Sequence, residues 1–303
     1  MITELQRQDF HKVNHIIDTH STLEVRAIVS GFNPGRIYVD DICDIKAALV
    51  WIQGQRGFQL IGDPQSESFA KELSAFMTTY IEPELVDLTL DSVEIGVQDG
   101  RWEGILRNMA GKRELSSDNQ HVYRFHSPQG TERVGGIEET DADVQHLDGK
   151  AVQLVRVDSA LIHDLKFANS SFLEDKITYF WNTVDDFLQH GFGYMLVHEQ
   201  NNEIMSICLS GFVAGQTHAI DIETVEAYRN RGYAAVVAKA FVEACRREGL
   251  QPYWDCSPDN TGSVRLAERV GMVFDFDYSV YWYPLSSKLG VSLFCYVKGN
   301  GHE

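Results

Sequence analysis

The feature that most constrains the fold of this 303-residue chain is a six-residue turn, Arg229-Asn230-Arg231-Gly232-Tyr233-Ala234. Before it, Ile220, Ile222 and Val225 mark a β-rich run. After it, apolar residues recur at helical spacing: Val236, Val237, Ala240, Phe241, Ala244 and Cys245. A turn that contains glycine and opens a helix exposes unpaired backbone N–H groups at the positive end of the helix dipole. The sequence therefore predicts an anion site here, best suited to phosphate.

The turn alone does not identify the phosphate compound. The three-glycine dinucleotide fingerprint and the P-loop lysine are both absent, and Arg-x-x-Gly-x-Ala matches unrelated turns by chance. An ordinary strand–helix–strand unit without a ligand is the alternative interpretation. The order of the elements in residues 217–271 makes the pattern more specific, because a second glycine-ended helix follows the next predicted strand.

That second segment carries Asn260-Thr261-Gly262-Ser263, Leu266 and Gly271-Met272. Together the two segments resemble the GNAT superfamily of N-acetyltransferases, with Met272 in place of the usual aromatic residue. The resemblance implies that amides of the turn hold the pyrophosphate of acetyl-CoA, and that the preceding strand splays from its neighbour to bind the pantetheine arm. The residues it assigns to acetyl-CoA are Ile222, Thr224, Val225, Arg229, Asn230, Arg231, Gly232, Tyr233, Ala234, Asn260 and Ser263.

Transfer to an amine needs a base, because a primary amine is mostly protonated near neutral pH. In the family that this segment resembles, a Glu or His on this strand often acts as the base. His218 and Glu223 are the candidates here. A surface histidine at a strand start is the alternative for His218. Asp221 and Glu223 share one face of their strand, opposite Ile220 and Ile222, and two such acids are costly unless they are paired or used.

The family's usual tyrosine, which protonates the departing thiolate, is Ala267 here. Ser263 and Tyr233 are the candidate replacements, and the thiolate can also leave toward water and the helix dipole. Trp254 is expected to pack in the core. Cys256 is not favoured as an acyl-carrying nucleophile, because no basic residue stands beside it in the sequence.

Composition narrows the class of protein. With 44% hydrophobic residues and 11% aromatics the chain is predicted to be globular, and no run is long enough for a membrane span. A formal charge of −18 argues against nucleic acid as a partner and agrees with a cationic substrate. Five scattered cysteines without Cys-x-x-Cys spacing suit free core thiols and a cytoplasmic protein that begins with no signal peptide. No metal site is predicted.

The chain is long enough for two domains. Residues 1–125 are predicted to form an α+β domain with a helix over 1–20, strands at Glu24–Ser30, Arg36–Asp40, Ala47–Trp51 and Phe58–Ile61, a helix from Ser66 to Tyr80 ended by Pro83, and strands within Asp87–Gln98 and at Val122–Phe125. This domain is either a degenerate copy of the same acetyltransferase fold or an unrelated lid or dimerisation domain.

Residues 126–149 are predicted to be a linker, with an acidic cluster (Glu138, Glu139, Asp141, Asp143, Asp148) that is a solvated stretch or an acidic rim for a polyamine. Residues 150–303 are predicted to be the catalytic domain, of mixed-sheet α/β class. Its expected elements are a strand at Ala151–Val157, a helix over Asp175–Gln189, a hairpin of Gly193–His198 with Glu203–Val213, the central segment, and strands near Val273–Tyr278, Val280–Pro284 and Val291–Val297.

Three functional hypotheses remain open. The first is an acetyl-CoA-dependent N-acetyltransferase acting on a small cationic amine, because two-domain relatives include self-resistance enzymes that acetylate a peptide-like antibiotic; an aminoglycoside-type acceptor belongs to the same hypothesis. The second is acetylation of a peptide or protein. The third is a non-catalytic CoA-binding or drug-binding protein. A monomer and a homodimer fit equally well.

Overall fold

The computed structural model describes residues 1–18, 21–125, 145–147, 149–158 and 167–285. These residues form two compact units, one of residues 1–121 with 276–285 and one of residues 122–275. The chain passes from the first unit to the second within one strand and returns within another. The predicted domains, 1–125 and 150–303, differ from these units mainly in the last described strand, whose residues from Phe276 on group with the first unit.

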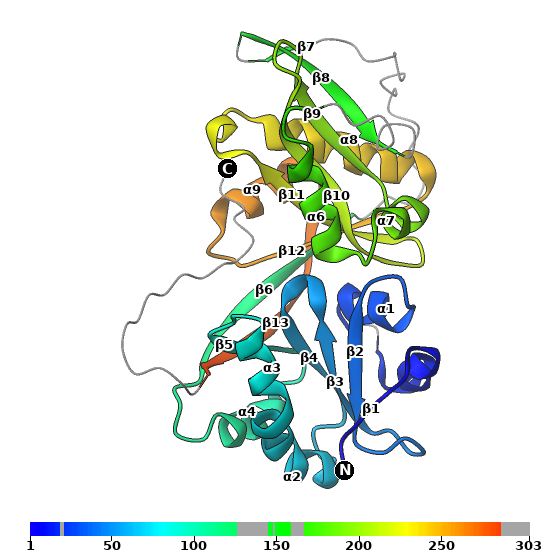
Figure 1. The fold of residues 1–303 in the computed structure, drawn as a ribbon, viewed down its shortest axis with the longest axis vertical. Coiled ribbons are helices and arrows are strands. Elements are labelled where there is room, and N and C mark those ends of the chain that lie inside the picture. Colours follow the sequence, from blue (N-terminus) through cyan, green and yellow to red (C-terminus); the bar gives the residue numbers. More distant parts are fainter. Residues whose placement is uncertain (19–20, 126–144, 148, 159–166, 286–303) are drawn as a thin grey trace. The chain divides into compact units, whose positions relative to one another are not determined.

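The first unit begins with a short strand and two helical segments, continues with three strands, and then has helices on either side of a further strand, β5, in the sequence (Figure 1). Its elements are β1 (Thr3–Glu4), a 3-10 helix (Arg7–Ile16), α1 (Leu23–Val29), β2 (Gly35–Val39), β3 (Ala47–Ile52), β4 (Gly57–Gly62), α2 (Glu67–Phe76), a π-helical turn (Met77–Ile81), α3 (Glu82–Asp87), β5 (Ser92–Val97), α4 (Glu103–Ala110) and the start of β6 (Ser116–Arg124).

The second unit has the longer strands and helices. Its elements are β7 (Gln145–Leu147), β8 (Lys150–Val157), α6 (Ser170–Phe180), α7 (Val184–His190), β9 (Gly193–His198), β10 (Glu203–Ala214), β11 (Thr217–Thr224), a 3-10 turn (Glu226–Tyr228), α8 (Tyr233–Glu248), β12 (Gln251–Cys256), α9 (Thr261–Arg269) and β13 (Val273–Pro284), which continues into the first unit.

The two units share one order of elements and one pattern of strand pairing. Among the described residues, one strand (β1 or β8) and two helical segments lead in each unit to three further strands, and these four strands pair antiparallel in sequence order. A helix then leads to a strand that pairs parallel with the one before the helix, as β5 does with β4 and β12 with β11. This shared pattern agrees with the prediction of a degenerate copy of the same fold.

Helices cover both faces of the sheet in the second unit. Ile220 and Ile222 of β11 lie on the face that packs against α8, together with Phe241 of that helix. On the opposite face α6 packs against β10, where the Trp181 indole that follows the helix donates to the Ser210 carbonyl oxygen (2.9 Å). Alternate residues of β11 therefore project toward different helices.

The strand beside β5 comes from the end of the described chain. β13 pairs antiparallel with β5 from Ser279↔Val97 to Pro284↔Ser92. Its Tyr283 is buried under the Arg113 guanidinium, which lies 4.2 Å from the ring centroid and pairs with Glu82 at 2.9 Å. These contacts fasten β13 into the core of the first unit.

Several predicted elements differ from the structure. Glu24–Ser30 was predicted as a strand but is helical in α1, because a helix buries Leu23, Val25 and Ile28 together and this packing overrides β-branched propensity. Pro83 does not end its helix, since it occupies the first turn of α3, where its missing N–H is tolerated.

Three other elements differ in length or number. The predicted helix over Asp175–Gln189 is divided, because Thr183 caps α7 by accepting from the Asp186 N–H. Val273–Pro284 is one strand rather than two, and β6 begins at Ser116, well before the predicted Val122. The predicted strand Val291–Val297 and the acidic cluster near 138–148 lie outside the described residues.

Candidate functional site

The parallel ladder between β11 and β12 is short. Its register runs from Thr217↔Gln251 to Ala219↔Tyr253, although β11 continues to Thr224 and β12 to Cys256. On its other edge β11 stays paired with β10 through Thr224. From Ile220 on, the edge of β11 that faces β12 is therefore not paired with it, which is the splay that the sequence predicted.

The turn that follows β11 is shaped to expose its backbone. Gly232 has φ +80° and Asn230 φ +62°, left-handed values that glycine and asparagine tolerate best. Arg229 Nε donates to the Thr224 carbonyl oxygen (3.1 Å) and ties the turn to the strand end. A Cβ at Gly232 would meet nothing within 4 Å, so the space in front of the helix is open.

The first turn of α8 carries no acidic residue and no side-chain cap. The leading N–H groups of a helix have no intrahelical acceptor, and here no carboxylate of the helix itself takes their place. Asn230, Arg231 and Gly232 are exposed. These residues fit a pyrophosphate group, whose charge the helix end and Arg231 would both favour.

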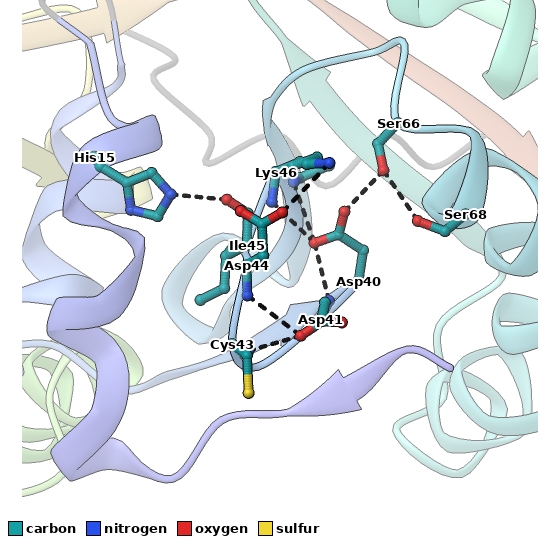
Figure 2. A network of polar contacts seen from close by, with 10 residues as sticks. His15, Asp40, Asp41, Cys43, Asp44, Ile45, Lys46, Ser66 and Ser68 are labelled. Carbon is teal, nitrogen blue, oxygen red and sulfur yellow. Dashed lines mark hydrogen bonds and ion pairs between the residues drawn. The ribbon is translucent and has the colours of Figure 1, made fainter.

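The corresponding connection in the first unit is built differently (Figure 2). Only residues 63–66 separate β4 from α2, against residues 225–232 between β11 and α8. Ser66 Oγ donates to Asp40 Oδ2 (2.7 Å), while Asp40 Oδ1 accepts the N–H groups of Asp41 and Lys46 at 3.0 Å. Glu67 stands in the first turn of α2. Carboxylates of the protein thus occupy the surroundings of this helix end.

The start of α9 combines capping with packing. Asn260 Oδ1 accepts from the Ser263 N–H (3.1 Å), and Ser263 Oγ accepts from the Trp254 indole (2.9 Å). Trp254 is buried, as predicted. Ala267 is also buried, so a polar side chain from this position is replaced by apolar packing.

The two acids of β11 are paired with a lysine from α6. Lys176 Nζ lies 2.8 Å from Glu223 Oε2 and 3.3 Å from Asp221 Oδ2. Burial raises the pKa of Asp221 above its usual value, with Glu223 adding to the shift and Lys176 opposing it. For Lys176, burial lowers the pKa, but the two carboxylates outweigh this and leave it above its usual value.

His218 lies on the other face of β11. It is buried, its ring stands 5.4 Å from that of Phe192, and Nδ1 is 3.0 Å from Ser210 Oγ. Burial lowers its pKa to about 4. The structure therefore does not bring His218 and Glu223 together, and His218 is no surface histidine.

A family model described as GNAT acetyltransferase matches residues 14–281. The chain belongs to the GNAT acetyltransferase family. It is accordingly an acyltransferase, and its function is acetyl transfer. GNAT acetyltransferases generally use acetyl-CoA as the donor.

Similar proteins support this GNAT assignment. The chain is 25% identical over 286 residues to the uncharacterized N-acetyltransferase YdfB of Bacillus subtilis (strain 168), covering 93% of this chain and 98% of that one. A GCN5-related N-acetyltransferase-like protein from Streptococcus suis has TM-score 0.59 and 20% identity, with 91% and 98% of the two chains covered. A tandem GNAT protein from the clavulanic acid biosynthesis pathway has TM-score 0.55 and 9% identity, with 95% and 99% covered. The two solved structures are similar in fold.

The cysteines and Tyr233 of this GNAT protein were also considered in the sequence, and the structure shows where they lie. Cys208, Cys245 and Cys256 are buried free thiols, whereas Cys43 is exposed. Tyr233 is buried in the core at the start of α8. Among the described residues no group of three His, Cys, Asp or Glu side chains could hold a metal ion. Within the same ranges, no helix combines the length and apolar character that crossing a membrane requires.

Sequence reasoning missed Lys176. Its helix was predicted to begin only at Asp175, and nothing in the local pattern shows that the lysine faces β11. The cost of two acids on one strand face was the available signal, because it called for a cation without saying which. Ser210, the partner of His218, was also missed, because nothing in the local pattern shows that it faces the histidine.

Proposed function

We propose that this GNAT enzyme transfers the acetyl group of acetyl-CoA to the primary amine of a small cationic molecule. The observation that carries the proposal is the open, left-handed turn at the start of α8, directly after a strand whose partner diverges. The first feature suits a pyrophosphate and the second an extended pantetheine arm. A peptide-like or aminoglycoside-type antibiotic is one acceptor of the required chemistry, which would make the enzyme a resistance factor.

In this proposal the turn binds the donor. Backbone N–H groups of Gly232, Tyr233 and Ala234 hold the pyrophosphate, assisted by Asn230 and Arg231. Arg229 acts through the loop, since its Nε is engaged with Thr224. The backbone of Ile222, Thr224 and Val225 lies along the pantetheine arm, and Asn260 and Ser263 border the site from α9.

Glu223 is the proposed base. It is the most exposed member of its cluster, at 30% for the side chain, and projects on the face opposite α8. It takes a proton from the acceptor ammonium; the neutral nitrogen attacks the thioester carbon, the C–S bond breaks, and an amide and CoA thiol result. Transfer is direct, with no acyl-enzyme, in line with the burial of Cys256.

His218 and Ser263 take indirect roles in this scheme. His218 supports the strand through Ser210, and Ser263 Oγ, in the first turn of α9, is held by the Trp254 indole. Ser263 remains the candidate donor of a proton to the departing thiolate, because Ala267 carries no polar group.

Calorimetric titration with acetyl-CoA tests the donor site. Gly232→Asp adds a carboxylate beside two phosphates and should weaken binding by about 100-fold. Gly232→Asn adds the same bulk without charge at a φ that asparagine tolerates, and should weaken it by less than about tenfold. If the wild type binds no acetyl-CoA, the proposal is wrong.

The acceptor is then sought with a panel of amines, from monoamines to polycationic antibiotics. The acetylated product is detected by mass spectrometry, because the exposed Cys43 thiol would interfere with a thiol reagent for CoA. Acetylation confined to uncharged or anionic compounds would contradict the proposed substrate class.

A further inference from the structure

Lys176 is an ammonium group held between two carboxylates. The lysine lies on α6, and both of its partners, Glu223 and Asp221, lie on β11. With one cation and two anions, the cluster keeps a net negative charge. A second ammonium group would find there a carboxylate whose charge Lys176 does not neutralise.

One oxygen of this cluster has unused hydrogen-bonding capacity. The contact of Asp221 Oδ2 with Lys176 is an ion pair without hydrogen-bond geometry, and among the described residues this buried atom accepts no hydrogen bond. A buried carboxylate oxygen left in this state is costly. An ammonium that enters along a different line than the lysine stem could donate to it.

The surroundings suit an alkylammonium ion. The Tyr179 and Phe180 ring centroids lie 5.9 Å and 5.8 Å from Lys176 Nζ, within the range of cation–π attraction. Solvent reaches the cluster from the side of Glu223, which is 30% exposed against 17% for Lys176 and 19% for Asp221. A small amine can therefore arrive at Glu223 first.

We propose that Asp221 and Glu223 form a binding site for a primary ammonium group, that Lys176 fills this site as an internal ligand, and that the acceptor amine binds by displacing it. The proposal rests on the proposed function and narrows its substrate class. A tethered ammonium competes at an effective concentration in the millimolar range, so a simple monoamine displaces it poorly. An acceptor with two or more positive charges gains further attraction from a chain of formal charge −18.

Chemical complementation tests this site without acetyl-CoA. Lys176→Ala leaves the carboxylates and removes the internal ligand, so propylammonium should enter the vacated space. In thermal unfolding, propylammonium chloride should raise the Tm of Lys176→Ala saturably, by about 3 °C or more. Tetramethylammonium chloride at equal concentration has the same charge but no N–H donor and should leave the Tm at its sodium chloride value.

Matched variants show whether the shift belongs to the site. The wild type and Lys239→Ala, which removes an exposed lysine paired with Glu243 on α8, should show no propylammonium-specific shift. The shift should also vanish in Lys176→Ala/Asp221→Asn/Glu223→Gln. Equal Tm values of Lys176→Ala in the three salts would overturn the proposal, as would an equal shift in Lys239→Ala.

A second variant covers the case in which Lys176→Ala does not fold. Lys176→Ala/Asp221→Asn removes the repulsion between the acids and keeps Glu223, so it should still respond to propylammonium, at higher concentrations. No saturable response in this variant overturns the proposal as well. Acetyl-CoA calorimetry on the same samples separates the two ideas, because loss of amine binding leaves the donor site of α8 intact.

Discussion

The N-termini of α8 and α2 occupy the same place in two units with the same order of elements, yet they offer opposite chemistry. At α8 a glycine at φ +80° opens onto free space, and the first turn holds no acid. At α2 the Asp40 carboxylate accepts from Ser66, and Glu67 stands in the first turn. One helix end can receive an external anion, whereas the other already has anions of its own.

The difference shows how one fold separates stability from binding. The long connection before α8 ends in the exposed residues 230–232, whereas the short one before α2 is joined to the loop of Asp40 through Ser66 (Figure 2). No side chain caps α2 either, but the Asp40 carboxylate beside Ser66 and Glu67 in the first turn would repel a phosphate, and the contacts of Asp40 fix the loop. This contrast agrees with the proposal that acetyl-CoA binds to the second unit.

The largest expected effect tests the acid of β11 against its counterpart. Glu223 lies four residues after Ala219, the last residue of β11 that pairs with β12. Asp63, just beyond β4, lies four residues after Gln59, the last residue of β4 that pairs with β5. Glu223→Gln should lower kcat/KM by about 10²–10³, the usual contribution of a general base. Asp63→Asn should leave it within about twofold, since an exposed substitution away from the site has little effect. Steady-state kinetics with an identified acceptor measures both, and comparable losses would remove the distinction between the units.

The next effect tests the closed network of the first unit. Asp40→Ala leaves several buried donors without an acceptor and should lower the free energy of unfolding by about 3 kcal/mol. Asp44→Ala, on the exposed part of the same loop, should change it by less than about 0.5 kcal/mol. Urea unfolding gives both values. Neither variant should alter acetyl-CoA affinity; a loss in Asp40→Ala at folded conditions would show that the first unit takes part in donor binding.

A pH comparison follows from His218. It stands one residue before the last β11–β12 ladder pair, and the residue at the same place in β4, before its last ladder pair with β5, is the apolar Phe58. The pKa of His218 is lowered to about 4 by burial, so between its unfolded pKa of about 6.5 and pH 4 only the unfolded chain gains a proton. The folded state therefore loses stability as the pH falls through this window, by about 2 kcal/mol at pH 4.5. His218→Phe should abolish this part of the loss, measured by urea unfolding at pH 7 and 4.5. An unchanged pH dependence in the variant would mean that His218 is not held neutral.

The smallest effect tests the two caps. Asn260 caps α9, and Asp99 caps the 3-10 turn (Gly100–Trp102) before α4 by accepting from the Arg101 N–H. Asn260→Ala and Asp99→Ala should each cost about 1 kcal/mol of unfolding free energy. Only Asn260→Ala should weaken acetyl-CoA binding, by a few-fold. The same calorimetric loss in Asp99→Ala would point to a general effect of destabilisation.

The sequence predicted what depends on neighbouring residues. The glycine-containing turn, the helix that follows it and the splay of β11 follow from a local pattern and a family resemblance. What it could not predict depends on packing between distant segments. Lys176 meets Glu223 only after α6 folds onto the sheet, and Glu24–Ser30 is helical because of what it covers. Alternation along β11 placed Asp221 and Glu223 on one face, but their partner lies 45 or more positions earlier in the chain.

The pairing of β13 with β5 has a consequence for synthesis on the ribosome. Residues 1–121 are made first, yet the part of β13 that pairs with β5 begins only at Ser279. At about 5–20 residues per second, the β5 edge waits on the order of ten seconds or more for its partner. An uncovered strand edge is a template for pairing with other chains. The nascent protein therefore has a vulnerable interval set by the order of its own sequence, and a chaperone that shields this edge would raise the yield of the folded enzyme.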